Sequence, residues 1–231
     1  MSVIISAHNG DDQTRRRARE AVIAGYWKPV YKHIRIKWNA TNEDAKDLTQ
    51  GFFTTTLESQ FFERFDASRA KFRTYLRMCL DGYVSNQKKA AGRHKRGGDI
   101  EHLSLDFESA EGELHQIPIS DTTEPDRVFR DEWIRSLFAR AIDDLRNWCT
   151  ENDKQMHFRI FEVYDLDTSE ERPSYADLAE ILGIPITQVT NFLALSRRTL
   201  RRLLLERIRE LSGSEQEFQD EVSDILGVPP E

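Results

Sequence analysis

Apolar residues recur at three- and four-residue spacing along most of the chain, and this spacing predicts helices. Pro29 is expected at the start of its helix, because the first helical residue needs no N–H donor. Thr41, with Asp44 three residues later, predicts the N-cap of another helix. In the first part of the chain the helical pattern covers residues 12–27, 29–38, 41–57 and 72–89, which predicts a first helical bundle.

The periodicity weakens between residues 99 and 132, where eleven acidic residues face only Arg127 and Arg130. Gly and Pro interrupt this segment, as is typical of a linker. Helical spacing returns at 131–148 and at 156–164. The expected fold class is therefore all-α, with two helical domains joined by an acidic linker. The expected limits are 12–98 for the first domain, 99–127 for the linker, 128–212 for the second domain and 213–231 for a C-terminal helical extension.

The sharpest local pattern begins at Ser174, which can cap a helix that Gly183 ends. A second helix follows after a short turn. This arrangement is typical of the helix-turn-helix motif, whose second helix enters the major groove of DNA. An antiparallel helix pair with a solvated Arg-rich face is the alternative. The second helix is expected to bury Val189, Leu193, Ser196, Leu200 and Leu203 and to present Thr187, Gln188, Thr190, Asn191 and Arg198 outward.

Charge is distributed unevenly. Between Arg69 and Arg96, nine Lys or Arg residues face one acid, Asp81, although the protein carries a formal net charge of -7. Such a local surplus is typical of a surface that meets a polyanion, and nucleic acid is the common case. The alternative is a solvated face. Because an apolar helical pattern begins in the same stretch, we expect a structured surface and not a basic tail.

No pattern points to catalysis. The six histidines have no metal-ligand spacing, and the chain has neither a Gly-rich phosphate loop nor a nucleophile motif. We therefore expect no enzyme activity, catalytic residue, metal, cofactor or small-molecule substrate. Cys79 and Cys149 are expected to be buried thiols. With no long apolar run and no basic n-region, neither a membrane span nor a signal peptide is expected, and the expected location is cytoplasmic.

Three stretches together suggest a family. They are Asp44-Ala-Lys-Asp-Leu-Thr-Gln-Gly-Phe-Phe53, then Phe72-Arg-Thr-Tyr-Leu76 on to Lys95-Arg-Gly-Gly98, and then Ser174-Tyr-Ala-Asp-Leu-Ala-Glu-Ile-Leu-Gly-Ile184. In this order they resemble regions 2.2, 2.3 with 2.4, and 4 of bacterial RNA polymerase sigma factors of the extracytoplasmic-function type. The likeness extends from about Tyr26 to Leu211. His102-Leu-Ser-Leu-Asp106 is similar to a subgroup with an acidic linker and a C-terminal extension.

The resemblance implies a protein that binds RNA polymerase core and directs promoter recognition. In the family, region 2.2 docks on a coiled coil of the largest polymerase subunit, and regions 2.3 and 2.4 bind the minus-ten element of promoter DNA. The positions that match the core-binding site are Asp47, Leu48, Gln50 and Phe53. In the DNA site, Asn86 and Gln87 match positions that contact an extruded base. The positions that match phosphate contacts are Lys88, Lys89, Arg93, Lys95 and Arg96. Tyr75 is a stacking candidate, and Phe72 and Tyr83 are expected in the core.

Region 4 departs from the commonest family pattern, because Thr190, Phe192 and Ala194 stand where many members have Lys, Arg and His. Contacts with the minus-thirty-five element are therefore expected from Gln188, Thr190 and Asn191, and phosphate contacts from Arg197, Arg198, Arg201 and Arg202. The acidic linker is expected either to pass through the nucleic-acid channel of the polymerase or to act as a solvated spacer.

Two other functions remain open: a stand-alone helix-turn-helix regulator, and a sigma-derived interaction protein that does not read promoters. The resemblance also allows an anti-sigma or other regulatory protein as a further partner.

Overall fold

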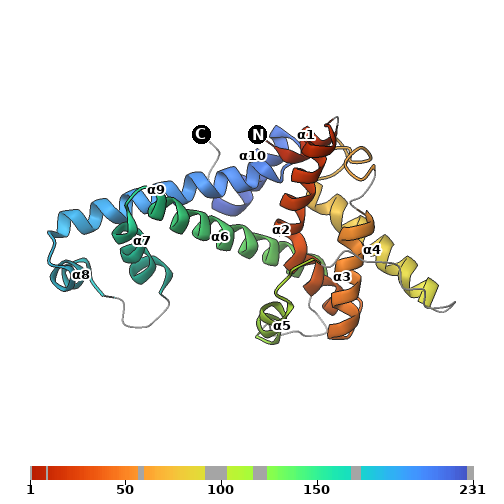
Figure 1. Ribbon diagram of the computed structural model, residues 1–231, viewed down its shortest axis with the longest axis horizontal. Coiled ribbons are helices and arrows are strands. Elements are labelled where there is room, and N and C mark those ends of the chain that lie inside the picture. Colours follow the sequence, from red (N-terminus) through yellow and green to blue (C-terminus); the bar gives the residue numbers. More distant parts are fainter. Residues whose placement is uncertain are drawn as a thin grey trace. The chain divides into compact units, whose positions relative to one another are not determined.

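The computed structural model describes residues 2–8, 10–56, 60–91, 103–116, 124–167 and 173–227. Every regular element within these ranges is a helix, which confirms the all-α class (Figure 1). The elements are α1 (Val3–His8), α2 (Asp12–Lys37), α3 (Asn42–Thr56), α4 (Phe72–Ala91), α5 (Phe107–His115), α6 (Pro125–Glu151), α7 (Gln155–Phe161), a π-helical turn η1 (Glu162–Leu166), α8 (Tyr175–Leu182), α9 (Ile186–Glu210) and α10 (Glu215–Leu226).

Helix α2 is continuous, so the prediction of two helices on either side of Pro29 is wrong. A proline inside a helix removes the N–H that would donate to the carbonyl four residues earlier, here that of Gly25, and costs about 3 kcal/mol. Both residues lie on the buried side of α2. This side packs against α1, α3, α4 and α5, and we attribute the continuity of the helix to that packing.

The chain forms two compact units. Unit 1 comprises Met1–Ser136 and Ile208–Glu231, and unit 2 comprises Leu137–Arg207, so the boundaries fall inside α6 and α9. These limits differ from the expected domains. Helix α10 lies within the expected C-terminal extension and is grouped with unit 1, to which it contributes buried Phe218 and Val222.

The core of unit 1 is rich in aromatic residues, and Phe72 lies at its centre, as expected. The Phe72 ring contacts those of Tyr26 and Phe61, each at 6.0 Å between centroids, and that of Phe65 at 5.3 Å. Tyr75 also belongs to this cluster, because its hydroxyl donates a hydrogen bond to the Phe61 carbonyl at 2.8 Å. Tyr75 is therefore used in packing, which counts against its expected role as a free stacking platform.

The C-terminal helix α10 supplies a cap for α4. Phe72 is the first residue of α4, so its N–H has no acceptor within that helix. The Glu217 carboxylate accepts this N–H at 2.7 Å and the Gly213 N–H at 2.7 Å. Burial raises the pKa of Glu217, while the two N–H groups act in the opposite direction. The contact joins segments 145 residues apart in the chain.

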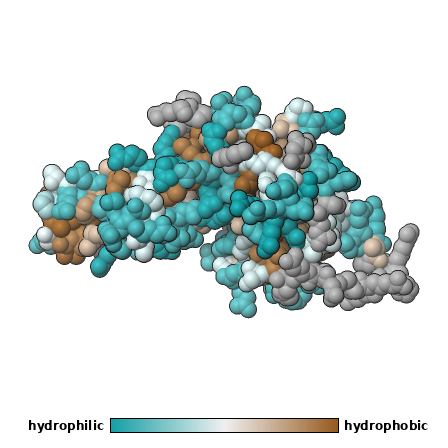
Figure 2. All heavy atoms as spheres, turned by 45° about the horizontal axis from the view of Figure 1, so that its top comes forward, coloured by the Kyte–Doolittle hydropathy of each residue, from teal (hydrophilic) through white to brown (hydrophobic). Residues whose placement is uncertain are grey.

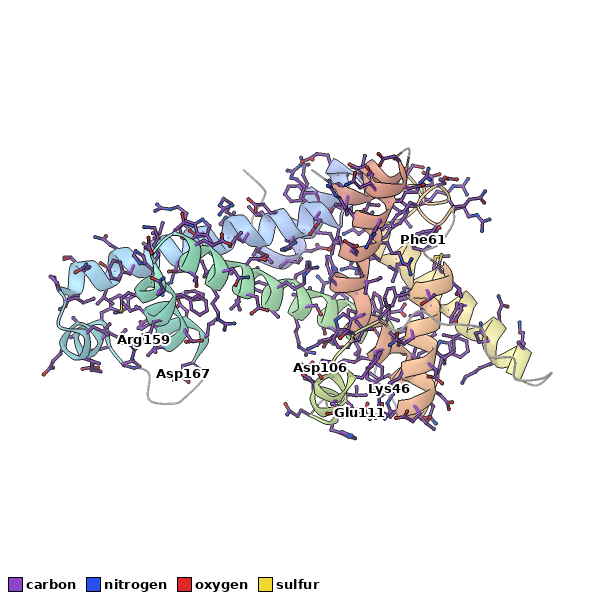
Figure 3. All side chains as sticks on the ribbon, viewed as in Figure 1. Lys46, Phe61, Asp106, Glu111, Arg159 and Asp167 are labelled. Atoms are coloured by element: carbon purple, nitrogen blue, oxygen red, sulfur yellow. The ribbon has the colours of Figure 1, made fainter. Side chains whose placement is uncertain are left out.

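Part of the expected linker is folded onto the first bundle. Asp106 caps the start of helix α5 by accepting the Ser109 N–H with its carboxylate, and Glu111 extends from the same helix (Figure 3). The Arg35 guanidinium on α2 donates to both Glu111 oxygens, at 3.0 and 2.6 Å. Arg35 lowers the pKa of Glu111 by these hydrogen bonds. Residues 103–116 therefore do not form a solvated spacer in this structure.

A buried lysine fixes the same helix. Lys32 on α2 is 1% exposed, and its ammonium lies 2.7 Å from Glu113 on α5 and 2.9 Å from Glu132 on α6. Lys28 reaches the other Glu113 oxygen at 2.6 Å. A charge this deeply buried is tolerated only when it is paired, so the three helices are held in one arrangement by Lys32.

Unit 2 has its own apolar core. The residues at its centre come from α6, α7, α8 and α9 and include Leu145, Phe158, Phe161, Leu178 and Leu193. Taken one by one, the described helices are each too short or too polar to cross a membrane, and only the bent pair α8 and α9 passes that test when combined, by length and composition alone.

Candidate nucleic-acid interface

Helix α8 has well-formed ends. Ser174 and Asp177 form a reciprocal capping box, in which the Ser174 hydroxyl accepts the Asp177 N–H and the Asp177 carboxylate accepts the Ser174 N–H at 2.7 Å. The latter bond lowers the pKa of Asp177. Gly183 ends the helix in the left-handed region at φ 63°, which favours glycine. The turn that follows sets α8 and α9 at 107°, within the range of helix-turn-helix motifs.

Three residues of the predicted inner side of α9, Val189, Leu193 and Ser196, are buried, whereas Leu200 and Leu203 are only half-buried. Val189 is 0% exposed and Leu193 1%, and both pack in the unit 2 core. The Ser196 hydroxyl is also buried and donates to the His157 carbonyl at 3.2 Å. The Phe192 ring contacts the His157 ring at 3.9 Å between centroids, with the two planes tilted by 37°. Because one side of α9 is fixed in this way, the opposite side is held toward solvent.

The outward side of α9 carries small polar groups. Gln188, Thr190 and Asn191 are all exposed, as predicted. The Thr190 hydroxyl donates to the Thr187 carbonyl at 2.9 Å. Ala194, one turn after Thr190, is exposed as well. These side chains are available to a ligand along the first turns of the helix.

The four arginines that follow are not equivalent. The Arg197 guanidinium forms a two-point ion pair with Asp165, at 2.9 and 2.8 Å, which raises its pKa. This pairing counts against the expected role of Arg197 in phosphate binding. Arg202 pairs with Glu206 at 2.6 Å. Arg198 and Arg201 are exposed and have no ion-pair partner among the described residues, so they are the available cations of α9.

Apolar side chains are also exposed where α8 and α9 meet. Ile181 on α8 is 74% exposed and Ile186, the first residue of α9, is 51% exposed. Figure 2 shows hydrophobic side chains at the surface of the end of unit 2 that carries α8. An exposed apolar residue at the start of the second helix is available for contact with a ligand.

Part of the positive charge in the basic stretch, residues 69–96, is neutralised by ion pairs. Its first four cations pair with acids inside unit 1, which reduces the surplus at the N-terminal half of α4. Lys88 and Lys89, near the end of α4, are exposed and remain for phosphates. The pairs are Arg69 with Asp66, Lys71 and Arg73 with Glu221, and Arg77 with Asp126.

Asp81, the one acid of the basic stretch, has a structural role that sequence reasoning missed. Its carboxylate contacts His33 at 3.0 Å, the Lys37 ammonium at 2.8 Å and the Trp38 indole N–H at 3.1 Å. Burial alone would raise the pKa of Asp81, but these hydrogen bonds hold it well below its usual range. Asp81 thus joins the end of α2 to α4. Its position as the one acid among nine cations is the sequence feature that could have predicted this role.

The predicted DNA contacts near the end of α4 are only partly described. Asn86 and Gln87 are exposed. The Lys88 ammonium donates to the Trp38 carbonyl at 2.8 Å and lies 5.3 Å from the centre of the Trp38 ring. Tyr83, expected in the core, is half-buried against Phe52. The other predicted phosphate contacts, Arg93, Lys95 and Arg96, lie outside the described residues.

Helix α3 presents only part of the predicted polymerase site. Asp47 is exposed and Leu48 half-buried. Phe53 is 0% exposed, so it belongs to the core of unit 1 and not to a surface anchor. The Gln50 amide is paired with the Leu103 backbone, accepting its N–H at 2.8 Å and donating to its carbonyl at 2.9 Å. The use of Gln50 and Phe53 inside the chain counts against their predicted role in polymerase binding.

No protein-family model, curated protein or solved structure matches the chain. No group of His, Cys, Asp and Glu suited to a metal ion occurs among the residues that the structure describes.

Proposed function

We propose that the protein is a sigma-type initiation factor that binds RNA polymerase core and directs it to promoter DNA. The observation that carries the proposal is the helix-turn-helix of α8 and α9. Its second helix is fixed on one side by Val189 and Leu193 and presents polar side chains, followed by Arg198 and Arg201, on the other. This is the distribution that major-groove binding needs, with base-reading groups early in the helix and phosphate contacts later.

The second DNA contact of the proposal is the end of α4. Lys88 and Lys89 lie in its last turn, and Asn86 is exposed beside them. In the proposed holoenzyme the two lysines bind phosphates of the minus-ten region, and Asn86 and Gln87 contact an unpaired base. Unit 2 reads the upstream element. The order of the sequence motifs supports this division of labour.

The proposed polymerase contact is smaller than the sequence motif suggests. With Gln50 and Phe53 used inside unit 1, the surface left on α3 includes Asp47, Leu48 and the exposed acids Glu43 and Asp44. An apolar side chain surrounded by charge fits a small docking site on a basic or mixed partner surface. We therefore assign the core contact chiefly to Leu48 and Asp47.

The engagement of Gln50 and Phe53 favours one alternative, a stand-alone helix-turn-helix regulator that does not need polymerase. The two functions separate by purification. The full chain is mixed with purified core enzyme and resolved by size-exclusion chromatography, and DNA binding is measured for the chain alone and for any complex.

The proposal expects the chain to elute with the core and to select DNA sequences only in that complex. Elution apart from the core, with sequence-selective DNA binding by the chain alone, would establish the regulator instead. Elution with the core and no sequence selection would identify an interaction protein that does not read promoters.

A further inference from the structure

We propose that α9 reads A·T base pairs by contacting thymine methyl groups and that it does not read guanine. The inference rests on the proposed function, because it requires α9 to enter a major groove. It concerns which bases the helix selects, which neither the motif order nor the fold determines.

The first argument is the lack of an available cation early in the helix. Guanine is most commonly read by Arg or Lys, which donate together to its O6 and N7 atoms. From Ile186 to Ser196, α9 contains no Lys or Arg, and Arg197 is held by Asp165. The N-terminal residues of a recognition helix are the ones that contact base edges. This part of α9 therefore has no available cation for the commonest guanine contact.

The second argument is the chemistry of the exposed side chains. Because the Thr190 hydroxyl donates its proton to the Thr187 carbonyl, Thr190 retains its methyl group and the acceptor lone pairs of its oxygen for contact, but no donor. Ala194 is four residues later on the same face and is exposed. Thr and Ala methyl groups are suited to the C5 methyl of thymine, which is the only methyl group that a base pair presents in the major groove.

The third argument is the adenine partner. Asn191 is exposed, follows Thr190 directly, and has no hydrogen-bond partner among the described residues. An Asn amide pairs with N6 and N7 of adenine. An A·T pair presents this adenine edge and the thymine methyl in the same groove. Asn191 and its methyl-bearing neighbours therefore recognise the two bases of one kind of base pair.

The test removes single methyl groups from DNA. The complex of full chain and core enzyme first selects sites from a randomised duplex library. Its affinity is then measured for a selected duplex and for duplexes in which deoxyuridine replaces one thymine of the upstream element. Loss of a buried methyl is worth about 0.8 kcal/mol, so we expect binding to fall about fourfold at each contacted thymine.

Two variants of one residue assign the effect. Thr190→Ser keeps the hydroxyl and loses the methyl, and it should bind the thymine and deoxyuridine duplexes about equally at one position. Thr190→Val keeps the methyl group, replaces the hydroxyl by a second methyl, and should retain the wild-type preference. Circular dichroism verifies that both variants fold.

Equal binding of the thymine and deoxyuridine duplexes by the wild-type complex would overturn the inference. It would also be overturned if the selected upstream elements were rich in guanine and the Thr190→Ser variant selected different bases at those positions. These results leave the proposed function standing, because the complex still selects DNA. A complex that selects no sequence contradicts the proposed function itself, and the inference with it.

Discussion

At the scale of single residues, the most constrained charge in the protein is Lys32, which lies between Glu113 and Glu132 with almost no exposure. Lys32→Ala would leave the Glu132 carboxylate, also buried, paired only with Arg135, at 3.0 Å. Breaking such a pair costs about 3–5 kcal/mol, so we expect a loss of this order in the free energy of unfolding measured in urea.

Lys28→Ala is the matched control, since Lys28 pairs with the same Glu113 but is partly exposed. It should cost about 1 kcal/mol or less. Equal losses in the two variants would contradict the idea that burial makes Lys32 special.

Asp81 predicts a pH dependence. Its folded pKa is below its usual value, so it stabilises the fold at any pH above the unfolded pKa of about 3.9, and this contribution is lost as the pH falls further. Asp81→Asn should therefore lower the free energy of unfolding by about 1.5–3 kcal/mol at pH 7. The difference from wild type should shrink below about pH 4, and unfolding curves at several pH values measure it. A difference that does not change with pH would show that the charge of Asp81 is not what stabilises the fold.

At the scale of helices, α9 is expected to divide base reading from phosphate binding. Asn191→Ala should weaken binding to the preferred upstream element by about 1–3 kcal/mol. It should also reduce the difference in affinity between that element and mutated elements. Arg198→Ala should weaken binding to every sequence and keep their order. Both are measured with the chain–core complex on a library randomised across the upstream element.

Arg202→Ala is the control for Arg198, because Arg202 is paired with Glu206 on the same helix. It should change binding little. An unchanged preference in the Asn191 variant would place base reading elsewhere, with Gln188 and Thr190 as the next candidates.

Helix α4 gives a salt-dependent prediction. Replacing Lys88 and Lys89 by Ala should lower the slope of log affinity against log salt by about 0.9 for each lost duplex phosphate contact. Arg69→Ala, which removes a cation already paired with Asp66, should leave the slope unchanged. A wild-type slope in the double variant would show that the two lysines are exposed to solvent and do not contact phosphates.

Helix α3 is tested by charge. Leu48→Glu should weaken core binding by about 2 kcal/mol or more, or about 30-fold in Kd, if Leu48 is the apolar centre of the contact. Lys46→Glu introduces the same side chain on a different face of the helix and should have a smaller effect. Binding is measured by titration of labelled chain with core enzyme, and undiminished binding of a folded Leu48→Glu variant would remove α3 from the interface.

Sequence patterns predicted these helices well where one face is apolar, as in α9, because burial of that face determines both the helix and its orientation. They failed where long-range contacts decide. Pro29 was expected to start a helix, yet packing carries α2 through it. For Gln50 and Arg197, the sequence suggested ligand contacts, but partners distant in the chain, Leu103 and Asp165, already occupy these side chains.

At the scale of the whole molecule, part of the acidic segment belongs to the first bundle and is not a linker. Its net charge suggested a spacer or a channel-filling linker, but α5 is held on α2 by ion pairs to Glu111 and Glu113. Composition alone does not reveal this, because the basic partners Lys28, Lys32 and Arg35 lie about 80 residues earlier in the chain. The first bundle is therefore built from two separate segments of the chain, the second of which contains the C-terminal helix α10.

The central claim is that the protein directs RNA polymerase to promoters, and run-off transcription tests it most directly. Purified core enzyme, a duplex carrying a selected site and the full chain are combined, and transcripts are measured. We predict a transcript of defined start that requires the chain and is strongly reduced by the double variant Arg198→Ala and Arg201→Ala. A chain that binds the duplex but yields no defined transcript with any selected site would contradict the claim.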